Sequence, residues 1–350
     1  MTASSNKRGA KPLLAITMGD PAGIGPEIVL KALRHSEVYE RCRPLVIGDR
    51  RILDRAAAWI GPTSLDIESV AKPGAADYRP GTVTLLDLAN AGPAACPVGQ
   101  VSAAAGKAAV DYVERACDLA LAGAVDGIAT APLNKAAMHL AGVSYPGHTE
   151  LLAARTGASN VRMLLVGPNL RVIHVSTHVA LTEAIRRVTI ESVLAAIESA
   201  AQACLALGIS EPRIAVAGLN PHAGEGGLFG DEEATRIVPA IERARRMGLD
   251  VHGPEPPDTV FLRATQGAFD IVVAMYHDQG HIPMKLLAFD AGVNVSIGLP
   301  IVRTSVDHGT AFDIAGSGKA REASLLAAID VAVQMVRARQ SANMSGKGGA

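Results

Sequence analysis

Short apolar runs alternate along this chain with longer segments in which apolar residues recur at helical spacing. The runs predict strands at 13–18, 127–130, 213–219, 271–276 and 293–297 and a β-hairpin at 161–166 and 171–175, and the longer segments predict helices over 101–121, 189–207, 232–247 and 322–339. Aromatic residues make up only 3% of the chain, so Ala, Val, Leu and Ile are expected to build the core. This alternation is typical of an α/β fold, in which helices cover both faces of a largely parallel sheet.

Length and charge narrow the class of protein further. A chain of 350 residues is expected to form about two domains. Its formal net charge is −1 and no run of Lys or Arg stands out, so neither nucleic acid nor a membrane surface is expected as a partner. The four cysteines are scattered, and no apolar run reaches the roughly 18 residues of a membrane span. We therefore expect a cytoplasmic protein, with disorder in about the first ten residues and after residue 340.

Three histidines, His178, His222 and His277, each follow a predicted strand. Ligands of open α/β sheets bind outside the carboxyl ends of the strands, so these imidazoles could converge there on one divalent metal ion such as Zn²⁺, Co²⁺, Ni²⁺ or Mn²⁺. Three independent histidines, each hydrogen-bonded at its own strand end, would give the same spacing. The polar, glycine-rich stretches NPHAGEGG and YHDQGHIP, interpreted as loops, favour the metal. Asp278 is a candidate further ligand or hydrogen-bond partner, and His281 is a weaker candidate.

A second group of residues indicates an anionic ligand. His148 and Thr149, in GHTELLAARTG, begin a predicted helix with Thr149 as its N-cap, and such a helix start is suited to phosphate or carboxylate. Simple capping would also explain the threonine. Lys135, Lys285 and Arg303 are cations in apolar or small-residue stretches, interpreted as loops or strand ends. Together they favour an anionic substrate over three partly buried ion pairs.

Two glycine-rich stretches are candidates for binding a nucleotide. The turn GDPAGIG at 19–25 lacks the third glycine of a dinucleotide fingerprint, so a tight strand-to-helix turn explains it. The stretch DHGTAFDIAGSG at 307–318 is the better candidate. Small residues such as Gly309 let a backbone approach an adenosine, and Asp313 could accept a hydrogen bond from a ribose hydroxyl.

Segments spread over about 13–320 carry a family resemblance: ITMGDPAGIGPEI, TAPLNKAAMHLAG, YPGHTELLA, GLNPHAGEGGLFGDEE, GPEPPDTVF, AMYHDQG and GLPIVRTSVDHGTAFDIAG. In this order they resemble the 4-hydroxythreonine-4-phosphate dehydrogenase family of pyridoxine biosynthesis. The resemblance implies the two-domain α/β/α fold of isocitrate and isopropylmalate dehydrogenases, with a mixed, largely parallel sheet and a cleft between the domains. It implies a discontinuous nucleotide-side domain at 1–130 plus 298–350 and a metal, substrate and dimerisation domain at 131–297. It also implies a homodimer with active sites at the subunit interface, each metal being held by ligands from both subunits.

The family's functional residues carry over onto matching positions of this chain. The metal ligands fall on His178, His222 and His277, and an acidic active-site position falls on Asp258. The substrate and phosphate contacts fall on His148, Thr149, Lys285, Asn294 and Arg303. The segment HGTAFDIAG resembles the adenosine-binding loop of these relatives, which implies cofactor contacts at Gly309 and Asp313, with a further one at Asn220.

The resemblance also implies a reaction that requires NAD or NADP and one divalent metal ion, Zn²⁺, Mg²⁺, Co²⁺ or Mn²⁺. The secondary hydroxyl of a 4-phosphorylated hydroxy acid is oxidised and the β-keto acid loses CO₂, with Lys285 or Asp258 handling the proton. His281 replaces the apolar residue typical of the biosynthetic enzymes, which resembles a catabolic branch acting on D-threonate or D-erythronate 4-phosphate. A terephthalate cis-dihydrodiol dehydrogenase is the alternative. A non-catalytic metal- or phosphate-binding protein is the alternative of another class.

Overall fold

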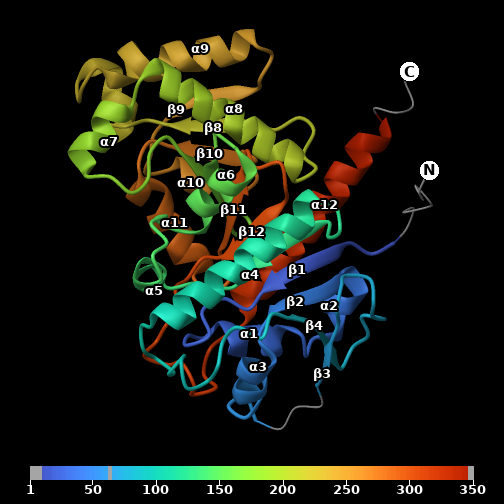
Figure 1. Cartoon of the computed structure of the whole chain (residues 1–350). Helices are drawn as coiled ribbons and strands as arrows, with labels where there is room; N and C mark the ends of the chain where they lie inside the picture. The colour runs from blue at the N-terminus through green and yellow to red at the C-terminus, as the bar shows by residue number, and fades with distance from the viewer. Residues whose placement is uncertain (1–9, 62–64, 346–350) are drawn as a thin grey trace. The chain divides into compact units, whose positions relative to one another are not determined.

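The computed structural model describes residues 10–61 and 65–345 (Figure 1). Within them the chain forms two compact units. The first unit comprises residues up to 156 together with 300–303 and 308–337, and the second comprises 157–299, 304–307 and residues from 338 onward. The domain boundaries expected at 130/131 and 297/298 stay a prediction.

The first unit is built on a parallel sheet with the strand order β3-β4-β2-β1-β5. These strands are β1 (Leu13–Thr17), β2 (Arg43–Gly48), β3 (Asp66–Ser69), β4 (Thr82–Asp87) and β5 (Gly127–Thr130). Every residue of β1 is buried, as expected for the apolar run LLAIT in a parallel sheet that is covered on both faces. The strands predicted near 13–18 and at 127–130 are confirmed.

Two helices of this unit carry candidate anion-binding residues, and both pack against a third helix, α4. The helices are α1 (Gly25–Ala32), α2 (Ser36–Arg41), α3 (Arg50–Ala57), α4 (Ala103–Leu121), α5 (Lys135–Leu140), α6 (His148–Thr156) and the part of α12 (Ala323–Ser345) up to residue 337. α4 begins where Ser102 Oγ accepts a hydrogen bond from the backbone N–H of Ala105. It packs against α5 and α6. The approach to α5 depends on Gly106, because a Cβ there would lie 2.0 Å from the carbonyl oxygen of Ala137.

The second unit contains a mixed sheet in which β12-β11-β6-β7-β10-β8-β9 follow one another. Its strands are β6 (Arg162–Val166), β7 (Arg171–His174), β8 (Ile214–Ala217), β9 (Val251–Glu255), β10 (Ile271–Ala274), β11 (Val293–Ile297) and residues 304–306 of β12 (Arg303–Val306). β6 and β7 form the predicted antiparallel hairpin, and β11 is antiparallel to both of its neighbours. β7, β10, β8 and β9 are parallel. The α/β class with a mixed, largely parallel sheet is therefore confirmed.

Helices α10 and α11 pack on this sheet over an apolar core. The helices of the unit are α7 (Leu181–Arg187), α8 (Ile190–Ala206), α9 (Val238–Arg246), α10 (Val260–Thr265) and α11 (His277–Ala288), with two short turns, η1 (Pro221–Gly227) and η2 (Glu233–Ile237). The core joins α10 and α11 to β7, β8 and β10 through Phe261, Met284, Val172, Ala215 and Val272. Burial of these side chains holds α11 against the strands that precede the candidate metal ligands.

The stretch YHDQGHIP was expected to be a loop, and this expectation is wrong. All of it after Tyr276 belongs to α11, although the helix contains Gly280 and Pro283. Tertiary packing overrides the poor helix propensity of the glycine here. A Cβ at position 280 would lie 2.4 Å from Nε2 of His174, so only glycine lets the helix lie this close to β7.

Two further boundaries differ from expectation. The helix predicted at 232–247 is divided into the π-helical turn η2 and α9, because Pro239 fits only in the first turn of a new helix. Helix α12 continues to Ser345, past the predicted end of order at 340. The other residues for which disorder was expected, 1–9 and 346–350, lie outside the described residues.

The described part of the chain has no single helix that is both long and apolar enough to cross a membrane. Helices α7 and α8 meet the length and hydropathy criterion only when taken together, and they are bent by 86° at their junction.

Candidate active site

The candidate metal ligands lie beyond the carboxyl ends of three neighbouring parallel strands of the second unit. His178 follows β7, His277 begins α11 after β10, and His222 lies in η1 after β8. The rings of His178 and His277 are close, with centroids 5.4 Å apart. Since His178 is exposed and His277 half-buried, this edge of the sheet presents two neighbouring imidazoles to solvent.

His222 makes a different ring contact. Its ring centroid lies 6.3 Å from that of Phe229. Among residues 10–61 and 65–345, no group of three or more His, Cys, Asp and Glu side chains is arranged to hold a metal ion. The chain therefore brings two of the three expected ligands together, and the role of the trio stays a prediction.

His277 is oriented by its neighbours on α11. Its Nδ1 lies 2.7 Å from Oδ1 of Asp278, and its ring stacks on that of His281 with centroids 3.6 Å apart. Nδ1 of His281 lies 3.0 Å from the backbone oxygen of His277. A carboxylate on one ring nitrogen presents the other nitrogen to a metal ion. The donor chemistry at the start of α11 therefore fits a divalent metal that accepts neutral imidazole.

His174, in β7, supports this helix start, although the sequence analysis did not single it out. Its ring is buried, with its centroid 4.8 Å from that of His281. Burial, assisted by His281 and His277, lowers the pKa of His174 to about 3, so the ring is neutral at physiological pH. The position could have been noticed as a polar residue within the apolar run RVIHV.

The first unit brings a buried cation close to His148. Arg303 is only 2% exposed, and its Nη2 donates to Oγ1 of Thr130 at 2.8 Å. Burial lowers the pKa of Arg303 to about 9, which leaves the guanidinium charged at neutral pH. Burial, Arg303 and Lys135 lower the pKa of His148, whose Nε2 is buried without a hydrogen-bond partner. Glu150 also acts on the charge of Arg303, and an anion bound here would provide an acceptor for both the guanidinium and the imidazole.

Thr149 is not the N-cap of α6, which corrects the sequence-based expectation. The helix begins at His148, and the N–H of Leu151 donates to the carbonyl oxygen of Gly147. Because this bond starts the helical ladder at Gly147, Thr149 lies inside the first turn. The two predicted anion contacts, His148 and Thr149, are thus the first two residues of the helix.

Lys285 lies inside α11 rather than on a loop, because the helix extends through the expected loop. Its Nζ donates to the backbone oxygen and to Oδ2 of Asp307, at 2.8 and 2.5 Å. In the sequence, Asp307 stands out only as the first residue of the candidate nucleotide-binding stretch. No local pattern predicts that it pairs with Lys285, which is 22 positions away. The carboxylate fixes the position of the ammonium group.

Asn294, on β11, is half-buried, and its amide oxygen has spare hydrogen-bonding capacity. Its Oδ1 is buried without a partner, and its Nδ2 lies 3.0 Å from Sδ of Met163. Buried amide oxygens are nearly always paired in folded proteins. Asn294 is therefore a reasonable contact for a ligand donor.

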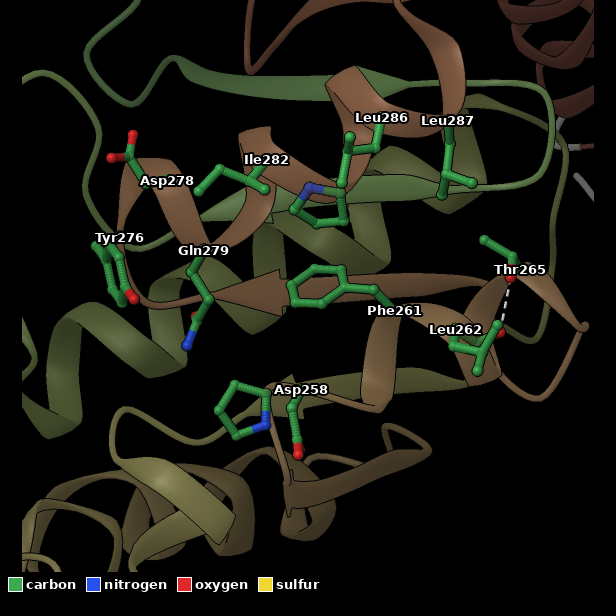
Figure 2. A pocket seen from close by; sticks show the side chains of 12 residues that line it. Asp258, Phe261, Leu262, Thr265, Tyr276, Asp278, Gln279, Ile282, Leu286 and Leu287 are labelled. Carbon is green, nitrogen blue, oxygen red and sulfur yellow. Dashed lines mark hydrogen bonds between the residues drawn. The ribbon is translucent and has the colours of Figure 1, made fainter.

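A groove of about 510 Å³ lies between α10 and α11 (Figure 2). Its walls are largely apolar, and Leu262, Ile282, Leu286 and Leu287 are between 57% and 82% exposed. Asp258, the expected acidic active-site residue, is exposed at one end of α10 and lines the groove together with Tyr276, Asp278 and Gln279. The groove thus joins an apolar surface to the start of α11.

In the candidate nucleotide-binding stretch, 307–318, the backbone is accessible to solvent at Gly309. Gly309 is exposed, and a Cβ there would meet no atom within 4 Å. Asp313 is exposed as well. An open backbone and an exposed carboxylate are compatible with an approaching nucleotide, and the cofactor contacts at Gly309, Asp313 and Asn220 stay a prediction.

The glycine-rich turn at 19–25 packs against that stretch within the first unit. The N–H of Ile24 donates to the carbonyl oxygen of Thr310, and a Cβ at Gly23 would lie 2.9 Å from Cβ of Thr310. A Cβ at Gly25 would lie 2.2 Å from the carbonyl oxygen of Met18. These glycines allow close backbone packing, so the interpretation of a tight strand-to-helix turn is confirmed.

Asp20, inside this turn, is a buried carboxylate that the sequence analysis did not single out. Its Oδ1 accepts a hydrogen bond from the N–H of Ala22, whereas its Oδ2 is buried without a partner. Burial raises the pKa of Asp20 to about 6. The sequence signal that could have identified Asp20 is an acidic residue between two apolar stretches.

Solved structures of similar proteins agree with this architecture. The fold matches 4-hydroxythreonine-4-phosphate dehydrogenase from Klebsiella pneumoniae with a TM-score of 0.86 and 46% identity, covering 94% of this chain and 99% of that one. It matches a terephthalate 1,2-cis-dihydrodiol dehydrogenase from Burkholderia xenovorans with a TM-score of 0.64 and 36% identity, covering 93% and 98%. The fold and these relatives define an α/β oxidoreductase.

Sequence comparison gives the family. Residues 40–332 match the model of the pyridoxal phosphate biosynthetic protein PdxA. The chain is 51% identical to D-threonate 4-phosphate dehydrogenase of Cupriavidus necator, over 94% of this chain and 98% of that one. It is also 51% identical to 4-hydroxythreonine-4-phosphate dehydrogenase of Desulfosudis oleivorans, over 92% and 96%. The chain belongs to the PdxA family.

Proposed function

We propose that this enzyme oxidises the secondary hydroxyl of a 4-phosphorylated hydroxy acid, D-threonate or D-erythronate 4-phosphate or 4-phosphohydroxy-L-threonine, with NAD or NADP as acceptor and loss of CO₂. The observation that carries the proposal is the buried cation Arg303 beside His148, whose Nε2 is buried without a hydrogen-bond partner. A guanidinium donates to a phosphate in a bidentate manner, and the phosphate also offers an acceptor to the imidazole. The names of relatives at about 50% identity support the same class of substrate.

We assign the phosphate to His148, Thr149 and Arg303. His148 has a lowered pKa and is neutral at pH 7, so it donates or accepts as an uncharged ring while Arg303 supplies the charge. Thr149 lies in the first turn of α6, where a hydroxyl and backbone N–H groups are suited to an anion. Asn294 would hold a further oxygen of the substrate through its amide group.

His178, His222 and His277 would hold one divalent metal ion, which supplies Lewis acidity for alcohol oxidation and decarboxylation when bound. The support is the donor chemistry: imidazoles past three adjacent strand ends, one of them oriented by Asp278. Lys285 handles the proton at its Nζ, which Asp307 holds in place. Asp258 is exposed and accessible as the alternative proton acceptor.

We further propose that the chain works as a homodimer in which His222 completes the metal site of the partner. Two observations support this arrangement: His222 has its ring contact with Phe229, and the groove between α10 and α11 exposes several large apolar side chains. Contiguous exposed apolar surface is typical of a protein interface. Leu286, 82% exposed, is its most exposed member.

The nicotinamide cofactor would lie along 307–318, with Gly309, Asp313 and Asn220 as contacts. The open backbone at Gly309 supports this assignment. Trp59 is the single tryptophan of the chain, and a Cβ at Gly316 would lie 3.7 Å from its ring. Its fluorescence is therefore a direct way to titrate NAD and NADP without any turnover.

The test is a side-by-side comparison of kcat/KM for 4-phosphothreonate, 4-phosphoerythronate, 4-phosphohydroxythreonine and a terephthalate cis-dihydrodiol. We expect at least one phosphorylated acid to exceed the dihydrodiol by about 100-fold, because a buried charge that loses its partner costs several kcal/mol. Each phosphorylated acid is paired with its dephosphorylated form as a control. A preference for the dihydrodiol would contradict the proposal and favour the function of the Burkholderia relative.

A further inference from the structure

The loop that carries His222 has an unusual backbone. His222, Ala223, Gly224, Glu225 and Gly226 follow one another with φ between 44° and 82°, which is the left-handed region. Three of these residues carry side chains, for which this conformation is unfavourable. A run of this length persists only where surrounding contacts hold it.

Glu233 provides contacts at the point where the chain enters this loop. Its Oε1 accepts hydrogen bonds from the backbone N–H groups of Leu219 and Asn220, both at 2.7 Å. Its Oε2 accepts from Nδ2 of Asn220 at 2.9 Å. One carboxylate therefore binds two successive backbone groups and a side chain immediately before the left-handed run.

The loop itself packs on the same carboxylate. A Cβ at Gly224 would lie 2.8 Å from Oε2 of Glu233, and a Cβ at Gly218 would lie 3.2 Å from Oε1. The backbone can approach this closely because both positions are glycine. The carboxylate is thus enclosed by the two ends of the turn around His222.

Glu233 is 5% exposed and is the first residue of the π-helical turn η2. Its neighbour Glu232 is half-buried and contacts only the side chain of Asn220 among these groups, at 2.8 Å. Single π-helical turns occur frequently at functional sites, where they re-aim a side chain. Here the turn directs Glu233, and not its neighbour Glu232, into the interior.

We propose that Glu233 is a positioning residue that holds the left-handed loop and so sets the direction of His222. The consequence for metal binding rests on the proposed function, in which His222 is a ligand. The effect of Glu233 on the position of the loop does not rest on the proposed function, and it is measured separately.

The experiment uses the full chain with Glu233→Gln, and Glu242→Gln, an exposed acid on α9, as the matched control. Backbone hydrogen exchange at 218–227 is measured on metal-free protein. We expect exchange to be about tenfold faster or more in Glu233→Gln, because charge-assisted hydrogen bonds to Leu219 and Asn220 weaken, and unchanged in Glu242→Gln. Exchange equal to wild type in Glu233→Gln overturns the proposal. If that variant fails to fold, Glu233→Asp, which keeps the charge but shortens the reach, takes its place with the same two outcomes.

Calorimetric titration with Mn²⁺ or Zn²⁺ alone then shows whether the position of the loop affects the affinity for the metal ion. We expect the Kd to rise about 10- to 100-fold in Glu233→Gln, and excess metal to restore kcat with KM for the phospho-acid unchanged. A merely structural role would leave the Kd unchanged whatever the Tm, which overturns the positioning role. If wild type binds no metal, the proposed metal site fails, and the exchange measurement alone decides whether Glu233 holds the loop.

Discussion

The proposed anion site of the first unit and the histidine edge of the second are built in opposite ways. The anion site is buried: Arg303 is 2% exposed and donates to Thr130, and Nε2 of His148 is inaccessible. The edge is open: His178 and His222 are exposed, and of the three expected metal ligands the structure pairs the rings of His178 and His277. A buried cation next to an imidazole with an unbonded, buried nitrogen is suited to an anion, whereas two neighbouring imidazoles at an open edge are too few ligands for a metal ion. We therefore predict that one chain completes the anion site, and that the metal site needs a ligand from a second chain.

The strongest test of the open site removes His222. We expect His222→Ala to lower kcat/KM at least about 1,000-fold, because the metal supplies several kcal/mol of transition-state stabilisation. Since the side chain is exposed, the Tm should stay near that of wild type. His139→Ala, another exposed histidine, is the control and should keep full activity. Full activity in His222→Ala would refute the ligand assignment.

The closed site is tested by Arg303→Met. We expect kcat/KM for the phosphorylated acid to fall about 100-fold, since a charge-assisted, bidentate contact is lost, while the value for the dephosphorylated acid changes little. The preference for the phosphorylated form is therefore the quantity to measure. An equal loss for both forms would mean that Arg303 maintains the fold and does not select the phosphate.

A smaller effect on turnover is expected when Asp307, the partner of Lys285 in the second unit, loses its charge. Asp307→Asn keeps the shape of the side chain but removes the charge beside Nζ of Lys285. We expect kcat to fall about tenfold, with Lys285→Ala lower still, because the ammonium is no longer held in one place. Steady-state kinetics of both variants and of the double variant provide the check. Independent, multiplicative losses in the double variant would contradict a shared role.

The last effect is on stability and not on activity, and it concerns Asp20 in the first unit. Its folded pKa of about 6 lies above the ordinary 3.8, so the stability from its bound proton is complete below about pH 4 and is lost as pH rises through 6. The loss amounts to roughly 3 kcal/mol at most. Asp20→Asn cannot lose this proton, so its Tm should gain on wild type between pH 4 and pH 7. A Tm difference that is constant with pH would show that Asp20 is not buried in its neutral form.

Sequence alone predicted the α/β class, the hairpin and most strands, because apolar periodicity and strand burial agree in this chain. It could not predict that YHDQGHIP is helical, since the packing of Gly280 on His174 overrides local propensity. Residue types suggested the histidines, Arg303 and Lys285. Asp307, the partner of Lys285, was missed, as was Glu233, which accepts hydrogen bonds from Leu219 and Asn220, because contacts between residues 13 to 22 positions apart leave no local pattern.

Subunit mixing tests the central claim that the histidine site is completed by a second chain. Differently tagged His222→Ala and His277→Ala chains are co-expressed and the mixed dimer is purified. If His222 completes the partner's site, this dimer has one intact site, and we expect about half of the wild-type turnover, although each variant alone is inactive. A mixed dimer of His178→Ala and His277→Ala has no intact site and should be inactive. An inactive His222→Ala/His277→Ala dimer would contradict the account, because it would place all three ligands within one chain.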